Sequence, residues 1–84
     1  MEENRIRKDN KMRILVEFFR GITADGKHLH YIEASGSSDE DKPEEESVGG
    51  PIADGSICIE SDTGKVYFFN EEAEDWIEQF SFKS

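Results

Sequence analysis

One stretch of the chain decides its fold: Gly55-Ser56-Ile57-Cys58-Ile59-Glu60-Ser61-Asp62-Thr63-Gly64-Lys65-Val66-Tyr67-Phe68-Phe69-Asn70. Apolar residues alternate through Ile57 and Ile59, an Asp-Thr-Gly turn follows, and β-branched and aromatic residues resume at Val66. Alternation, a turn and renewed strand-favouring residues are together typical of a β-hairpin. We therefore predict strands at about 56–61 and 65–70.

A second hairpin is expected on the N-terminal side of this stretch. Residues 12–20 favour a strand and alternate roughly, which predicts that three apolar side chains share one face of it: Ile14, Val16 and Phe18. Asp25-Gly26 is a strong turn signal, and residues 27–33 again favour a strand. The two strands should pair across a loop of five or six residues.

The segment after Asn70 allows two interpretations. Apolar residues at helical spacing, with acidic residues in the first turn, are compatible with a short helix over 71–80. The alternation of residues 76–82 instead places Trp76, Phe80 and Phe82 on one face of a strand. We favour the strand and keep the helix as the alternative.

These elements predict a mainly β protein, a small antiparallel β-meander of about five strands. Residues 1–11 are polar and locally basic, and we expect a flexible N-terminal arm there. Residues 12–84 should form one small domain. Serine, glycine and a run of acidic residues fill its middle, which predicts a disordered acidic loop at 35–50.

The charge of the chain excludes several classes of partner. Its 84 residues carry a formal net charge of −10, which would repel nucleic-acid phosphates and anionic membrane surfaces. No apolar run approaches the roughly 20 residues that span a bilayer, and the N-terminus lacks the apolar core of a secretory signal. We expect synthesis in the cytoplasm, no membrane association and no small-molecule substrate.

Short motifs that can carry chemistry have simpler structural explanations here. Asp62-Thr63-Gly64 spells the catalytic tripeptide of aspartic proteases, but its neighbours do not fit and a tight turn explains it. His28 and His30 would share a strand face without an evident third zinc ligand. Cys58 is the single cysteine and fits a small core filler. We predict no catalytic residues, no metal site and no cofactor.

The stretch from Gly55 to Tyr67, followed by Trp76-Ile77-Glu78, resembles a pattern of bacteriophage structural proteins, including tail-fibre modules. The resemblance covers residues 53–80, a third of the chain. It implies a non-enzymatic structural or assembly protein of phage or prophage origin, a virion accessory or a head or tail component. Its partners would be other phage structural proteins or further copies of itself, and the virion would be a further location.

The aromatic residues outnumber what one face of five short strands needs, so some should cover a second layer or a partner's surface. Tyr67, Phe69 and Trp76 are the predicted protein-contact residues, with a core role as the alternative. A different function remains open. The negative charge could mimic nucleic acid, making the protein a decoy or regulator that binds a basic host protein.

Overall fold

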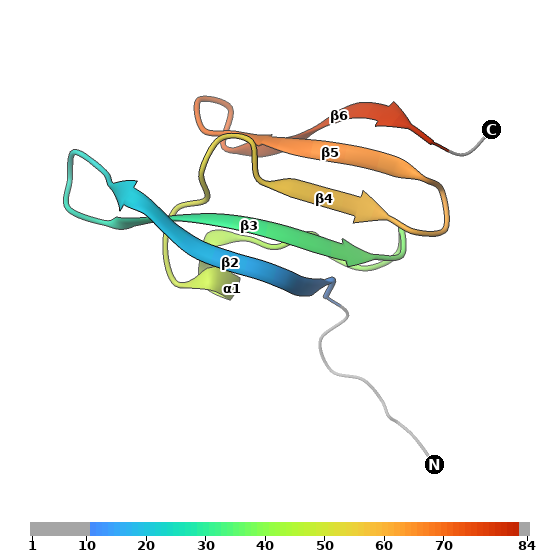
Figure 1. The fold of residues 1–84 in the computed structure, drawn as a ribbon, viewed down its shortest axis with the longest axis horizontal. Helices are drawn as coiled ribbons and strands as arrows, with labels where there is room; N and C mark the ends of the chain where they lie inside the picture. Colours follow the sequence, from blue (N-terminus) through green and yellow to red (C-terminus); the bar gives the residue numbers. More distant parts are fainter. Residues whose placement is uncertain (1–10, 83–84) are drawn as a thin grey trace, which may run out of the picture.

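The computed structural model describes residues 11–82, which form one five-stranded sheet and one short helix (Figure 1). The sheet order is β2-β3-β4-β5-β6, so strands that follow one another in sequence lie side by side. The elements are β2 (Arg13–Ile22), β3 (His28–Gly36), α1 (Glu45–Val48), β4 (Ile57–Glu60), β5 (Lys65–Asn70) and β6 (Asp75–Ser81).

Three of the four strand pairs are antiparallel, and β3 and β4 are parallel. This mixed, mostly antiparallel sheet confirms the predicted fold class. Both predicted hairpins are present, and Gly64 in the β4–β5 turn has a φ of 78°, a conformation that favours glycine. The last segment is a strand and not the alternative helix. The predicted arm lies, except for Lys11, outside the described residues.

A parallel pair needs a connection that carries the chain from the end of the first strand back to the end of the sheet at which that strand began. Residues 37–56 provide it and are called the crossover below; it runs behind β3 in Figure 1. This differs from the disordered acidic loop that we expected for 35–50. Ser35 and Gly36 belong to β3, and α1 starts at a reciprocal capping box between Glu44 and Ser47. Buried Val48 and Ile52 attach the segment to the sheet.

The core lies between the crossover and one face of the sheet, called the covered face. Alternating residues of β3 and β4 supply it, as expected for strands with one buried face. One cluster contains Met12, Ala34 and Cys58, and the other contains Ile32, Val48 and Ile52. Cys58 has no exposed surface, which confirms its role as a core filler.

Two β-bulges correct the predicted side-chain faces. A register shift between Ile14 and Val16 turns Ile14 toward the core and leaves Val16 and Phe18 on the opposite face. A second register shift, in β6 opposite Val66 and Tyr67, places Trp76 on the covered face and Phe80 on the opposite face. A bulge inserts one extra residue into a strand and so reverses the alternation beyond it. The predictions failed at these positions because they assumed unbroken alternation.

Candidate protein-contact surface

The face of the sheet opposite the crossover, called the open face below, has no layer packed on it among the described residues. Paired residues of neighbouring strands share a face, so the registers define rows of side chains across it. The rows are Val16–Glu33–Ile57–Phe68–Ile77 and Arg13–Ser35–Ile59–Val66–Phe80, with the pair Phe18–Tyr31 beside them.

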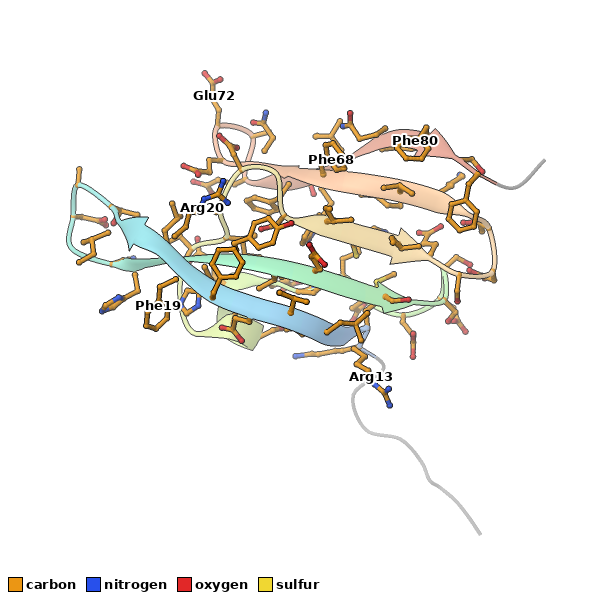
Figure 2. All side chains as sticks on the ribbon, viewed as in Figure 1. Arg13, Phe19, Arg20, Phe68, Glu72 and Phe80 are labelled. Carbon is orange, nitrogen blue, oxygen red and sulfur yellow. The ribbon has the colours of Figure 1, made fainter. Side chains whose placement is uncertain are left out.

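These rows form a mainly apolar surface, which is interrupted by Glu33 on β3 and by Arg13 and Ser35 at one end of the β2–β3 pair. Val16, Phe18, Phe68, Ile77 and Phe80 are between 38% and 54% exposed. Phe68 and Phe80, labelled in Figure 2, lie on the neighbouring strands β5 and β6. Monomeric soluble proteins rarely expose a contiguous apolar patch across a whole sheet, and such patches mark interaction sites. The open face is therefore the candidate contact surface.

Polar groups on the open face are paired with its aromatic rings. The Tyr31 hydroxyl donates to Glu33 Oε2 at 2.7 Å, and this hydrogen bond raises the pKa of Tyr31. The Phe18 and Tyr31 rings stack with centroids 4.8 Å apart. The guanidinium of Arg20 lies 5.3 Å from the Tyr31 centroid. These contacts hold the β2–β3 part of the face in a defined arrangement before any partner binds.

The predicted contact residues lie on the covered face and not on the open one. Tyr67, Phe69 and Trp76 are half-buried and pack against the core clusters. Phe69 and Trp76 meet edge to face at 5.1 Å, and Trp76 Nε1 donates to the Pro43 carbonyl at 2.9 Å. Packing against the core accounts for the positions of these three side chains, and a contact role for them stays a prediction. Sequence patterning missed the open-face residues because it could not show which face the crossover covers.

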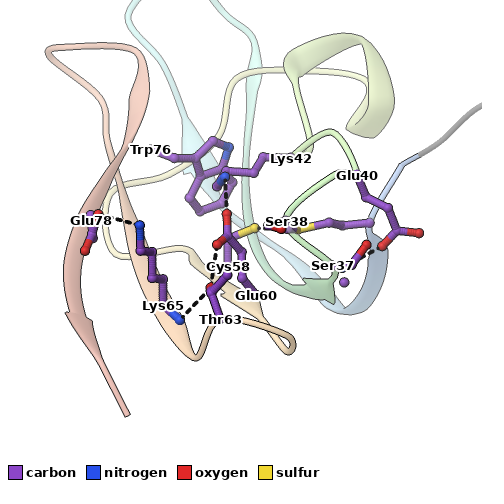
Figure 3. Close-up of polar contacts among 12 residues, drawn as sticks. Ser37, Ser38, Glu40, Lys42, Cys58, Glu60, Thr63, Lys65, Trp76 and Glu78 are labelled. Carbon is purple, nitrogen blue, oxygen red and sulfur yellow. Dashed lines mark hydrogen bonds and ion pairs between the residues drawn. The ribbon is translucent and has the colours of Figure 1, made fainter. Parts of the chain in front are cut away.

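A buried polar network fastens the acidic crossover to the sheet (Figure 3). Glu60, 4% exposed, accepts hydrogen bonds from the Thr63 hydroxyl at 2.6 Å and from Lys42 Nζ at 3.1 Å. Lys42 Nζ also lies 4.0 Å from the centroid of the Tyr67 ring. The Thr63 hydrogen bond and then Lys42 lower the pKa of Glu60. Burial, followed by the hydrogen bond to Glu60, raises the pKa of Tyr67 to about 12.

The crossover borders a hollow of about 710 Å³ that combines acidic and aromatic groups. Phe69 and Trp76 line it together with acidic residues of two segments: Glu40, Asp41, Glu44, Glu45 and Glu46 of the crossover, and Glu74 and Asp75 at the start of β6. The crossover carries seven acidic residues and one lysine. The acidic charge is thus concentrated on the side of the sheet away from the open face.

The remaining motifs have structural partners. Asp62 accepts hydrogen bonds from the Ser38 backbone at 2.9 Å and from the Ser38 hydroxyl at 2.7 Å, which places the tripeptide in a turn tied to the crossover. Buried His30 lies 2.9 Å from Glu17 through Nδ1. Within residues 11–82, no three His, Cys, Asp or Glu side chains gather as metal ligands would.

Within the same residues, no helix has the length and apolar character needed to cross a membrane. No protein-family model matches the chain, and comparisons with curated proteins and with solved structures also found no match. The resemblance to phage structural proteins therefore stays a prediction.

Proposed function

We propose that this protein acts by protein–protein contact through the open face of its sheet, as a non-enzymatic structural or assembly component. One observation carries the proposal: each of the five strands contributes apolar or aromatic side chains to the open face, while both core clusters lie on the other face. Leaving such a surface in water favours aggregation, so its presence is best explained by a partner that covers it.

The resemblance of residues 53–80 to phage structural proteins gives the proposal its context. A virion is an assembly of repeated protein contacts, and a small sheet with one apolar face suits a component that becomes ordered between larger neighbours. A chain of this length also buries a modest share of its surface by itself, and a partner would add to that burial.

Site-specific photo-crosslinking in the cells that produce the protein tests this proposal. A benzophenone side chain replaces Phe68 on the open face in one variant and Asp25 in a second. Asp25 is the matched control because its side chain is 68% exposed in the β2–β3 turn, away from the face. Covalent adducts are then identified by mass spectrometry.

We expect the probe at Phe68 to give a defined adduct with a protein chain and the probe at Asp25 to give none. An adduct with a virion protein, or with a second copy of this chain, supports a structural component. Equal labelling from both positions, or no protein adduct from Phe68, would overturn the proposal.

A second function is favoured by a different observation. Lys42, Val48 and Ile52 fix the crossover on the sheet, so its carboxylates are held on a folded surface as a nucleic-acid mimic requires. Phe69 and Trp76 in the adjoining hollow could also contact the stem of a basic side chain. The alternative function is thus an acidic decoy or regulator of a basic host protein.

The same experiment separates the two functions with a third probe at Glu45, which lies in the crossover and lines the hollow. The salt dependence is measured by irradiating a lysate of these cells at increasing salt concentration. A decoy would be crosslinked from Glu45 to a basic protein, and the yield of this adduct would fall as the salt concentration rises. A contact through the open face would be captured from Phe68 and would persist in salt, since apolar burial is not screened.

A further inference from the structure

We propose that the open face binds a second copy of this chain face to face, so that two sheets form a β-sandwich around a twofold axis. This inference rests on the proposed function, in which the open face is a contact surface, and names its occupant. The charge distribution, the position of Glu33 and the area of the face all favour this occupant.

The charge of the chain is distributed so that two open faces can meet. A net charge of −10 opposes the pairing of two copies in general, but the acidic crossover lies on the far side of the sheet from the open face. Sheets pack about 10 Å apart, and each crossover adds a layer of similar thickness outside them. The two crossovers would then lie about 30 Å apart, roughly three Debye lengths at 0.1 M salt. A face-to-face pair therefore keeps most of the repulsive charge screened.

The Glu33 carboxylate lies in a row with Val16, Ile57 and Phe68. A partner that covers this row removes the carboxylate from water, which is costly unless a cation or hydrogen-bond donors pair with it. The open face itself carries two guanidinium groups: Arg13 pairs with Ser35 in register, and Arg20 stacks over Tyr31.

Arg13 and Arg20 balance Glu33 and Asp75, which pairs with Asn70 at the end of β5, so this face lacks the acidic excess of the whole chain. A twofold interface brings the same patch of both copies together, so a self-complementary surface must supply its own opposite charges. The open face meets this condition, because each copy offers guanidinium groups to the Glu33 of the other. It also offers apolar side chains to apolar side chains across the remaining rows.

The area of the open face suits a small, reversible interface. Five strands at about 4.8 Å spacing are about 24 Å wide, and strands of about six residues are about 20 Å long. Each copy would bury roughly 500 Å², or about 1,000 Å² in total, at the lower limit for a specific interface. We therefore expect a reversible dimer with a dissociation constant in the micromolar range.

Sedimentation velocity of the purified full chain, from about 1 μM to about 1 mM, measures this equilibrium directly. The wild-type protein should shift from monomer to dimer over this range. Phe18→Asp and Phe68→Asp place a carboxylate on the open face, and each should raise the dissociation constant at least about tenfold. Two variants are used because they lie on different strands, β2 and β5.

Phe19→Asp is the matched control. Phe19 is adjacent in sequence, is 63% exposed, and pairs with His30 on the other side of the sheet. The control should dimerise like the wild type, and circular dichroism should show that all three variants keep their strands. Arg20→Glu adds a second test: in a self-complementary pair the change occurs in both copies, so the dimer should weaken at least about tenfold.

A wild-type monomer at every concentration would overturn the inference, and so would a dimer that Phe18→Asp and Phe68→Asp leave intact. A monomer in this assay, combined with a crosslink from Phe68 to a different protein, would reject the second copy as occupant while preserving the proposed function. Absence of both the dimer and the crosslink would reject both proposals.

Discussion

Replacing Lys42 with methionine should destabilise the protein far more than its place in an acidic, solvent-facing segment suggests. The change removes the ammonium that lies 3.1 Å from Glu60 Oε2, while the Glu60 side chain stays 6% exposed. Breaking a buried ion pair by removing one partner costs about 3–5 kcal/mol. Lys42 is itself 23% exposed, and Thr63 still donates to Glu60, so we reduce this to about 2–4 kcal/mol.

That loss is large beside the total stability. A domain of 84 residues has a free energy of unfolding of about 4–13 kcal/mol. At about 4–8 °C for each kcal/mol, Lys42→Met should lower the melting temperature by about 8–32 °C. The assay is urea unfolding followed by Trp76 fluorescence, with thermal unfolding by circular dichroism at the same fixed protein concentration, since any dimerisation adds to apparent stability.

The chain offers a matched control in Lys65→Met. Lys65 lies 3.9 Å from Glu78, and both side chains are exposed, at 44% and 50%. Exposed pairs contribute about 0–1 kcal/mol, so this variant should unfold close to the wild type. A Lys42→Met variant that unfolds within about 0.5 kcal/mol of the Lys65→Met variant would refute the argument that Glu60 depends on a buried partner.

Three further predictions concern the buried groups. Because its hydrogen bonds lower the pKa of Glu60 below the usual 4.5, Glu60 stabilises the fold above about pH 4.5, and this contribution is lost as the pH falls through the folded-state value. Glu60→Gln should thus be less stable than the wild type at pH 7, and the gap in urea midpoints should close in acid; a constant gap would contradict this. The buried Ile32 N–H donates to Ser56 Oγ at 3.0 Å, and Ser56→Ala removes this acceptor. The free energy of unfolding, measured in urea, should fall by about 1–3 kcal/mol. An unchanged urea midpoint would show that another acceptor replaces Ser56. Burial raises the pKa of Cys58 to about 12. A thiol reagent should therefore react roughly a thousandfold more slowly with the folded chain than with the urea-unfolded chain. Equal reaction rates would show that the reagent reaches the thiol in the folded chain.

Local sequence was sufficient for most of the secondary structure. The turn residues Asp25-Gly26 and Thr63-Gly64, with alternating residues beside them, predicted both hairpins, because turn chemistry and alternation act within a few residues. The last strand was predicted from the spacing of Trp76, Phe80 and Phe82 alone, and the strand is present although Trp76 and Phe80 lie on different faces. The bulges in β2 and β6 were missed because the extra residue is stabilised by the neighbouring strand and leaves no local signal.

The ordered crossover could not be predicted from local sequence. Its composition is that of a solvated loop, yet Val48 and Ile52 are buried and Lys42 neutralises Glu60 on β4. Each of these contacts joins residues far apart in the chain, so none can be inferred from the segment itself. The sparse apolar residues of an acidic segment can attach it when the sheet provides a complementary surface.

The sequence by itself determined where strands form and which residues alternate along them. It also showed that the chain has more aromatic side chains than one buried face requires, and pairs such as Phe18-Phe19 and Phe68-Phe69 place rings on both faces of a sheet. Only the tertiary structure decided which face the crossover covers. Tyr67, Phe69 and Trp76 therefore pack beside the core, while Phe18, Phe68 and Phe80 remain open to a partner. The physical reason is that alternation is a property of each strand, whereas burial depends on a layer contributed by residues distant in sequence.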